Sequence, residues 1–467
     1  MCRRAAGGRQ VLLDSRLREI CQRHLLYSLG RFEDQVRRVQ LPGNLPGLMR
    51  EQSRLLLGLV VGAGLGLVAR AVAGDAPWLS WTLANVTGPI GQIFLRLLFM
   101  LVGPMIFSAL VMGVADLELR HLGRLGVRAL GYTVVISTIA VLIGLGLVNL
   151  LRPGEGMSDE VRALARSSVV PKAATAPGDG SVAGLLVSIV PDNPVKAAAS
   201  GDYLGLIFFA LVFGIALGMT RAPAAERLKE VIAGLYEVTL VLIGGVLKVA
   251  PIGVAALVFG MTARLGFEVF RQLAAYVGVV LLGLGLHMFV VYSLSVRFFG
   301  GRNPVQFFRD VRLAAITAFS TSSSNATLPT ALKVAEEELR LPPSVARFVL
   351  TAGASMNQNG TALFEGVTVL FMAQLFGVHL SLQEQLVVMF ICVLGGIGTA
   401  GVPAGSLPVV AMILGMFRIP PEGLGLILGV DRLLDMSRTT LNVVGDLAAA
   451  VYVARGEPEA PRGAPGT

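Results

Sequence analysis

A stripe of four polar residues, Asp435, Arg438, Asn442 and Asp446, lies within the largely apolar stretch from Gly423 to Val453. Steps of three, four and four residues place all of them on one face of a helix. The guanidinium of Arg438 matches the geometry of a carboxylate, and Asp435 suits an ammonium group. Asn442 and Asp446 offer oxygen ligands for a hard cation. Because each charge at the centre of a spanning helix costs about 2.5–3.5 kcal/mol, these four residues predict a binding site inside a membrane.

The alternative interpretation is an internal ion pair between Asp435 and Arg438 that only neutralises itself. That pair explains two residues and leaves Asn442 and Asp446 without a role. Asp431 and Arg432 precede them by one turn, and two interpretations stay open for these residues: a structural role, or the lining of an access path.

The composition excludes most soluble classes. Of 467 residues, 54% are hydrophobic and only 15% are charged, against about 25% in soluble domains. The mean hydropathy is +0.71, so we expect an all-α polytopic membrane protein. The net charge of +9 is spread between apolar blocks, which is typical of membrane orientation and not of nucleic-acid binding. The three cysteines are isolated, so we expect neither a disulfide framework, nor a metal centre, nor a resident cofactor.

Apolar runs long enough to cross a bilayer predict eight spanning helices. They lie near 53–73, 89–115, 127–151, 203–220, 232–262, 272–297, 345–375 and 423–453. Arginine-rich connections alternate along the chain, which predicts a plasma-membrane protein with both termini in the cytoplasm. Residues 1–50 are interpreted as a basic interfacial segment, 152–184 as an external loop, and 456–467 as a disordered tail.

Two further apolar segments are broken in the middle. Residues 313–331 are interrupted by Ser320 to Asn325, and 382–417 by Gly395 to Pro403. Both are too short to cross twice, so each predicts a hairpin that enters and leaves by one face. Each hairpin precedes a spanning helix with polar residues at its centre. This duplication predicts a transporter built from an inverted repeat, with residues 51–455 as the transporter domain.

Each motif has a competing interpretation. The serine cluster 320–324 suits an anion at a hairpin tip, or it is a flexible linker. Gly396, Gly398 and Gly401 match a dinucleotide fingerprint by letter only, because no βαβ unit surrounds them. The run from Asn357 to Thr361 predicts an unwound, cation-binding helix, or else helix–helix hydrogen bonds. An intramembrane hydrolase would need a base near the serines, and an anion channel would not need Asp435.

The chain resembles the dicarboxylate/amino acid:cation symporter family, the glutamate transporter family, in its bacterial form. The resemblance covers residues 53–455 and is densest in 320–329 (STSSSNATLP), 357–365 (NQNGTALFE), 398–403 (GTAGVP) and 431–446 (DRLLDMSRTTLNVVGD). It implies a homotrimer with an elevator mechanism. Scaffold helices would occupy 53–115 and 203–262, and a transport domain 127–151 and 272–453.

The resemblance also implies an activity, a symporter that brings glutamate or aspartate into the cell with sodium, and with protons as a second candidate ion. Sodium is then a co-transported substrate. A C4-dicarboxylate carrier is the nearer alternative, and Asp435 argues against it, because it would repel a substrate that has no ammonium group.

The site residues follow from the resemblance. The substrate-binding residues implied are Ser322, Ser323, Ser324, Thr361, Val402, Asp435, Arg438, Thr439 and Asn442. One sodium site is similar to Gly353, Asn357, Asn442 and Asp446, and a second to Ser355, Gly396, Ile397 and Thr399. Glu365 is the candidate proton carrier.

This chain departs from the family pattern at two places. Asn359 replaces a carboxylate associated with a third sodium site, and Thr133 and Ile136 replace two further residues there, while Ser137 remains. These changes predict that the third site is lost. The accessory arginine of relatives is also absent, since Ser322 and Met436 stand at the two positions that carry it.

Overall fold

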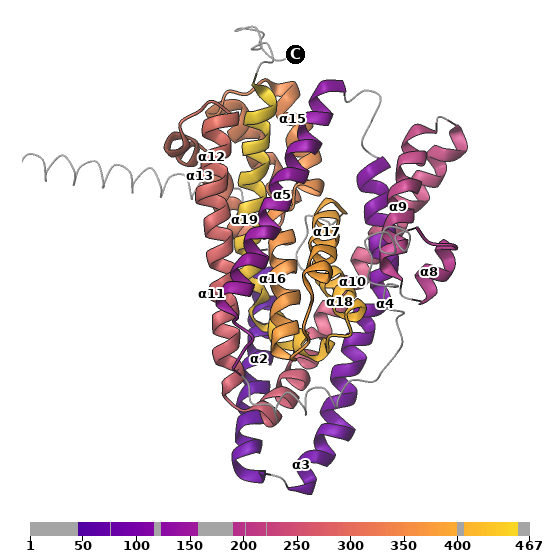
Figure 1. Ribbon diagram of the computed structural model, residues 1–467, viewed down its shortest axis with the longest axis vertical. Coiled ribbons are helices and arrows are strands. Elements are labelled where there is room, and N and C mark those ends of the chain that lie inside the picture. Colours follow the sequence, from indigo (N-terminus) through magenta and orange to yellow (C-terminus); the bar gives the residue numbers. More distant parts are fainter. Residues whose placement is uncertain are drawn as a thin grey trace, which may run out of the picture. The chain divides into compact units, whose positions relative to one another are not determined.

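A computed structural model describes residues 45–74, 76–115, 123–156, 190–200, 202–220, 222–398 and 406–455 (Figure 1). The interfacial segment up to residue 44, most of the 152–184 loop and the tail after 455 lie outside these ranges. Within the described ranges the regular secondary structure is entirely helical. The all-α prediction is confirmed there.

The long helices follow the apolar runs. They are α2 (Leu45–Ala73), α4 (Gly88–Ala115), α5 (Gly123–Leu151), α9 (Tyr203–Met219), α10 (Pro223–Leu265), α11 (Glu268–Leu286), α15 (Pro343–Met356), α16 (Asn359–Leu375) and α19 (Leu424–Ala454). Short elements are α3 (Pro77–Thr82) with the π-turn η1 (Leu83–Thr87), α8 (Pro194–Ser200), and η5 (Pro421–Gly423).

Five helical stretches in the described ranges are long and apolar enough to span a membrane. They are 54–73, 77–115, 125–151, 223–264 and 268–299. The other three predicted spans differ for physical reasons. α9 has only 17 residues, the 345–375 run is split at Asn357 and Gln358, and α19 carries the charged residues between Asp431 and Asp446. The structure thus supports a membrane protein, and the count of eight spans stays a prediction.

The helices pack in two sets. α10 packs on α2 and α4, and α4 packs on α9. In the second set, α5, α11, α16 and α19 run alongside one another (Figure 1). α17 and α18 contact α4, and α19 contacts α2 and α10, so the two sets share an interface.

The first hairpin is present and is longer than the predicted 313–331. It consists of α13 (Pro304–Thr321) and α14 (Ser324–Lys333), which continues into the π-turn η4 (Val334–Glu338). The first arm starts nine residues early because Asn303 caps the backbone N–H of Val305 at 2.9 Å and Pro304 fixes the first helical φ. Hydropathy misses this start, since Arg309 and Arg312 make the base of the arm polar.

Only Ser322 and Ser323 separate the two arms. Ser322 is in the left-handed region at φ +49°, which turns the chain. The Ser323 hydroxyl accepts a hydrogen bond from the N–H of Ala326 at 3.2 Å and caps α14. The hydroxyls of Thr321 and Thr327 bond to each other at 2.9 Å across the hairpin. The serine cluster therefore forms an ordered tip and not a flexible linker.

The second hairpin is also present. Its arms are α17 (Leu382–Gly398) and α18 (Leu407–Met416), close to the predicted 382–417, and they pack on each other. The predicted break at 395–403 differs from this in its first part, because residues 395–398 are still helical in α17. Residues 399–405 lie outside the described ranges.

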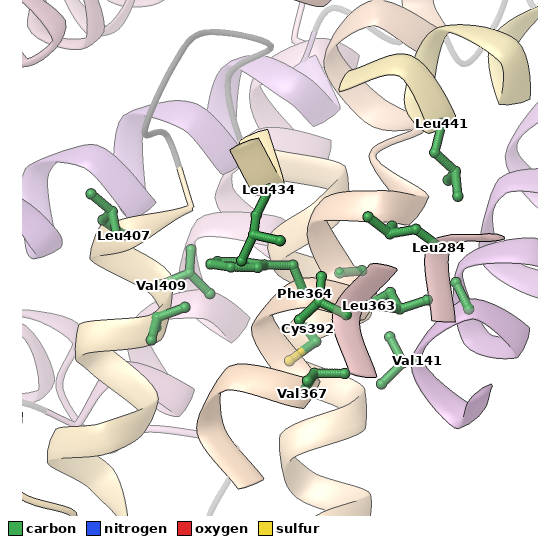
Figure 2. Packing of buried hydrophobic residues seen from close by; sticks show 14 of the residues in the cluster. Val141, Leu284, Leu363, Phe364, Val367, Cys392, Leu407, Val409, Leu434 and Leu441 are labelled. Atoms are coloured by element: carbon green, nitrogen blue, oxygen red, sulfur yellow. The ribbon is translucent and has the colours of Figure 1, made fainter. Parts of the chain in front are cut away.

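The core of the second set is built around α16. Figure 2 shows Leu363, Phe364 and Val367 of α16 among Val141 of α5, Leu284 of α11, and Leu434 and Leu441 of α19. All of these side chains are buried. Apolar packing on every side fixes α16 against α19, which brings together the two polar regions found in the sequence.

Candidate functional site

The α15–α16 connection is an unwound segment inside the packed core. α15 ends at Met356 and α16 begins at Asn359, with Asn357 and Gln358 out of helical geometry between them. The side-chain amide of Gln358 donates to the carbonyl of Ala354 at 2.8 Å. A break of this kind frees the last carbonyls of α15 for other partners. The predicted unwinding at Asn357 is confirmed.

Asn442 of α19 joins this break to the stripe. Its side-chain oxygen accepts from the N–H of Gly360 at 2.7 Å. Its side-chain nitrogen donates to Gln358 Oε1 at 2.5 Å and to the Thr361 hydroxyl at 3.2 Å. Gly360 is needed for this approach, because a β-carbon there would lie 2.8 Å from the Arg438 carbonyl. Thr361 and Asn442 therefore form one hydrogen-bonded unit.

Arg438 forms the charged end of the stripe and is 2% exposed. It donates to Asp435 Oδ1 at 2.6 Å, and its other terminal nitrogen lies 3.2 Å from Asp431 Oδ1. Its guanidinium also lies over the Phe364 ring, 3.9 Å from the centroid. The internal Asp435–Arg438 pair thus exists. Among the described residues, however, Nε of Arg438 has no hydrogen-bond partner, and the terminal nitrogen near Asp431 makes only that ion-pair contact, so donors remain for a bound carboxylate.

Asp431 is a site residue that the sequence interpretation did not assign. It is 7% exposed and faces Arg438 from two turns away. The seven-residue spacing to Arg438 was the available signal, since i and i+7 share a helical face.

The other end of the stripe is rich in oxygen. Asn357 Nδ2 donates to Asp446 Oδ1 at 2.9 Å, and Asn357 Oδ1 has no partner among the described residues. Gly353 lies against Asp446, since a β-carbon there would be 2.5 Å from Oδ1. A cavity of about 20 Å³, room for one water, is lined by Thr133, Gly353 and Asn357 among others.

One carboxylate with amide and main-chain oxygens suits a hard cation such as sodium. In the described ranges no group of three His, Cys, Asp or Glu gathers as for a transition metal. The structure therefore brings together Gly353, Asn357 and Asp446 of the first predicted sodium set. Asn442 lies one turn away on α19, and its oxygen is already bonded to Gly360.

The second predicted sodium set is only partly described. Gly396 of α17 lies against α16 and the break, since a β-carbon there would be 3.3 Å from the carbonyl oxygen of Gln358. The side chain of Ser355 is exposed. Thr399 and Val402 lie outside the described residues, as does the side chain of Ile397. The carbonyl that faces Gly396 is thus that of Gln358.

The first hairpin supplies the three serines of the predicted substrate set, Ser322, Ser323 and Ser324. Both of its arms pack on α19. Ser322 and Ser324 are buried, at 1% and 3% exposure, and the Ser322 hydroxyl has no partner among the described residues. Thr439 is buried on α19. The tip of this hairpin is therefore buried against the rest of the protein, and the Ser322 hydroxyl is available to a ligand.

Comparison with known proteins agrees with this arrangement. The sequence model described as the sodium:dicarboxylate symporter family matches residues 52–456. The chain belongs to this family. The hairpins, the broken helix and the charged stripe all fall within the matched region.

Several relatives align over most of their length. The proton/glutamate-aspartate symporter of Escherichia coli (strain K12) is 33% identical over 86% of this chain and 92% of its own length. The proton/sodium-glutamate symport protein of Geobacillus stearothermophilus is 32% identical, over 86% and 95%. The C4-dicarboxylate transport protein of Rhodospirillum rubrum is 33% identical, over 81% and 85%.

Glu365 has the lowest exposure among the acidic residues that the structure describes. Its exposure is 0%, and neither carboxyl oxygen has a hydrogen-bond partner among the described residues. A β-carbon on Gly395 would lie 3.2 Å from Glu365 Oε2, so the acid sits against an arm of the second hairpin. A carboxyl group in such a place is costly to ionise without a partner. That is the chemistry expected of a group that carries a proton.

Gly353→Ala tests the cation end of the site in this symporter family member. The new methyl group overlaps the Asp446 carboxylate, so we expect the half-saturating sodium concentration for uptake to rise by about tenfold or more. Sodium titration of uptake in proteoliposomes measures it. Gly146→Ala on α5 is the control, because a β-carbon there meets nothing within 4 Å. Equal sodium dependence in both variants would argue against a cation beside Gly353.

Proposed function

We propose that this protein is a secondary active symporter that brings an acidic amino acid, glutamate or aspartate, into the cell together with sodium, with protons as a second candidate ion. Its family membership and the names of its Escherichia coli and Geobacillus relatives support the proposal. The observation that carries it is the buried Arg438 beside Asp435. This pair offers a cation and an anion one turn apart, which matches a carboxylate and an ammonium group on one small molecule.

Substrate binding then exchanges partners at this pair. In the structure Arg438 bonds to Asp435 and lies near Asp431. A side-chain carboxylate would take Nε of Arg438 and the terminal nitrogen that Asp435 releases, and an ammonium group would take Asp435. Asp431 would keep the other terminal nitrogen of Arg438. No buried charge is left unpaired by this exchange, which is the condition for burying ions at a low cost. The proposed contacts for the main-chain carboxylate are Asn442, Thr361 and the tip at Ser322 to Ser324.

A C4-dicarboxylate is the second candidate substrate, supported by the Rhodospirillum relative. It would bring a second carboxylate to a site that already holds Asp431 and Asp435. Such a substrate has no ammonium group to compensate Asp435 when Arg438 turns to the ligand. The charge balance therefore favours the amino acid.

Cation binding is proposed to be coupled to substrate binding through hydrogen bonds. A cation beside Asp446 would draw in the free oxygen of Asn357 and stiffen the break. The break in turn holds Asn442 through Gln358 and Gly360. Each net positive charge moved inward gains about 2.3 kcal/mol per 100 mV, which makes accumulation of an anionic amino acid favourable. Glu365 is the proposed proton carrier.

The transport motion proposed is an elevator within a homotrimer. The two packed sets support it, with α2, α4, α9 and α10 as scaffold, and α5, α11, α13 to α19 as the moving body. Eight spans with two re-entrant hairpins, a plasma-membrane location and cytoplasmic termini belong to the same proposal.

Uptake into proteoliposomes tests the function. Radiolabelled glutamate, aspartate and succinate are supplied under sodium and proton gradients imposed separately. We expect gradient-driven uptake of the two amino acids. Uptake of succinate without either amino acid would overturn the substrate assignment, and flux independent of both gradients would indicate a channel.

A further inference from the structure

A hydrogen-bond network of Ser137, Asn359 and Tyr292 crosses the core beside the cation end of the site. The Ser137 hydroxyl of α5 donates to Asn359 Oδ1 at 2.6 Å. Asn359 Nδ2 donates to the Tyr292 hydroxyl at 2.9 Å, and that hydroxyl donates to the carbonyl of Leu441 at 3.2 Å. The three side chains are 1%, 0% and 0% exposed. This network thus links α5, α16 and α12 (Tyr292–Leu294) to α19, and none of its three side chains is charged.

This network differs from the neighbouring cation end because the hydrogen-bonding atoms of its amide are all partnered. The oxygen and the nitrogen of Asn359 each have a partner, whereas Asn357 keeps an unpartnered oxygen next to a carboxylate. A buried, neutral group with its bonds made has no need of an ion. We therefore interpret Ser137, Asn359 and Tyr292 as structural hydrogen-bonding residues and not as cation ligands.

The local backbone places the Tyr292 hydroxyl against α19. Tyr292 lies between two π-turns, η2 (His287–Val291) and η3 (Ser295–Phe299), and such turns re-aim side chains within a helix. Gly445 supplies the space, because a β-carbon there would overlap the Tyr292 hydroxyl. The contact is therefore with the backbone turn from Leu441 to Gly445.

That turn carries the ligand residues. Asn442 directly follows Leu441, and Asp446 directly follows Gly445. A shift or rotation of this turn would move Asp446 relative to Asn357 and Gly353. Whatever fixes the turn also fixes the distance between the oxygens that would coordinate a cation.

We propose that Tyr292, held by Asn359 and Ser137, is a positioning residue that sets the cation affinity of this transporter. The proposal rests on the proposed function, because it assumes a coupling cation beside Asp446. Without the hydroxyl, Asn359 has an unpartnered buried donor, and the backbone of the Leu441 to Gly445 turn loses its hydrogen bond to Tyr292. The cation ligands then have to be ordered when the cation binds, which weakens its binding.

The test compares Tyr292→Phe with Tyr276→Phe. Tyr276 is equally buried, donates or accepts one bond with the Thr368 hydroxyl at 2.8 Å, and stacks on Phe371 at 4.6 Å between centroids. Both changes remove one buried hydroxyl from the same helical run. Uptake is titrated with sodium, the cation proposed to bind beside Asp446. Thermal stability is measured alongside.

We expect Tyr292→Phe to raise the half-saturating cation concentration by about tenfold, with the glutamate KM at saturating cation within about twofold of its original value. Tyr276→Phe should leave the cation dependence unchanged, even where it lowers the melting temperature as much. Ser137→Ala, which removes the hydroxyl at the other end of the hydrogen-bond network, should shift the cation dependence in the same direction as Tyr292→Phe.

Equal cation dependence of Tyr292→Phe and the unaltered protein would overturn the proposal, as would an equal shift in Tyr276→Phe. Should Tyr292→Phe not fold, unchanged cation dependence in Ser137→Ala overturns it instead. Failure of the proposed function is seen separately, in an unaltered protein whose uptake responds to neither cation gradient, and that result removes both proposals.

Discussion

Arg438→Cys is expected to abolish the preference for acidic amino acids and to admit neutral ones. The guanidinium is buried and compensates both Asp431 and Asp435. Without it, a substrate carboxylate would face two acids in a low-dielectric site. Loss of one partner of a buried pair costs about 3–5 kcal/mol, so affinity for aspartate and glutamate should fall by about 100-fold or more. Asp435 remains for the ammonium group, which every amino acid has.

Competition of radiolabelled uptake by aspartate, glutamate, serine and cysteine measures this change. Arg432→Cys is the matched control, because Arg432 is less buried and its nearest nitrogen lies 3.7 Å from Asp435 Oδ2. It should keep the acidic preference. Melting temperatures of both variants separate a changed site from a poorly folded protein. Unchanged aspartate affinity in a folded Arg438→Cys protein would remove Arg438 from the site.

Helical periodicity predicted the part of this site that belongs to one helix. The stripe lies on one face of α19, and the amide-rich run does interrupt a helix, because both patterns depend only on local geometry. Which helix faces the stripe is a matter of tertiary packing. The bond from Gly360 to Asn442 and the approach of Gly396 to Gln358 could therefore not be derived from spacing.

The predicted segment boundaries are wrong where a helix extends beyond its apolar residues. The first hairpin was predicted to begin at 313, since Arg309 and Arg312 look like a flank. The Asn303–Pro304 cap starts the helix earlier, and an amphipathic arm carries those arginines at its base. Tyr292 was missed altogether, because an aromatic residue in an apolar helix gives no signal until a partner such as Asn359 is placed beside it.

The neutrality of Asn359 leads to the second large prediction. Asn359→Asp changes the shape of the side chain little but introduces a charge at 0% exposure, one helix away from Asp446. The Ser137 hydroxyl can still donate to it, and Tyr292 can donate to it only by leaving the Leu441 carbonyl. Two hydroxyl bonds do not compensate a buried carboxylate. The variant should therefore require an additional cation, and its uptake should depend more steeply on sodium.

Sodium titration and the ratio of charge to substrate moved at a fixed membrane potential measure this requirement. We expect uptake at low sodium to fall by about tenfold or more, with recovery at high sodium and at least one further charge per substrate. Asn149→Asp is the control, because it makes the same change at an exposed position on α5. If Asn359→Asp keeps the original sodium and pH dependence, a carboxylate at this position neither recruits a cation nor takes up a proton. The neutral hydrogen-bond network through Tyr292 would then not explain why Asn359 is no cation ligand.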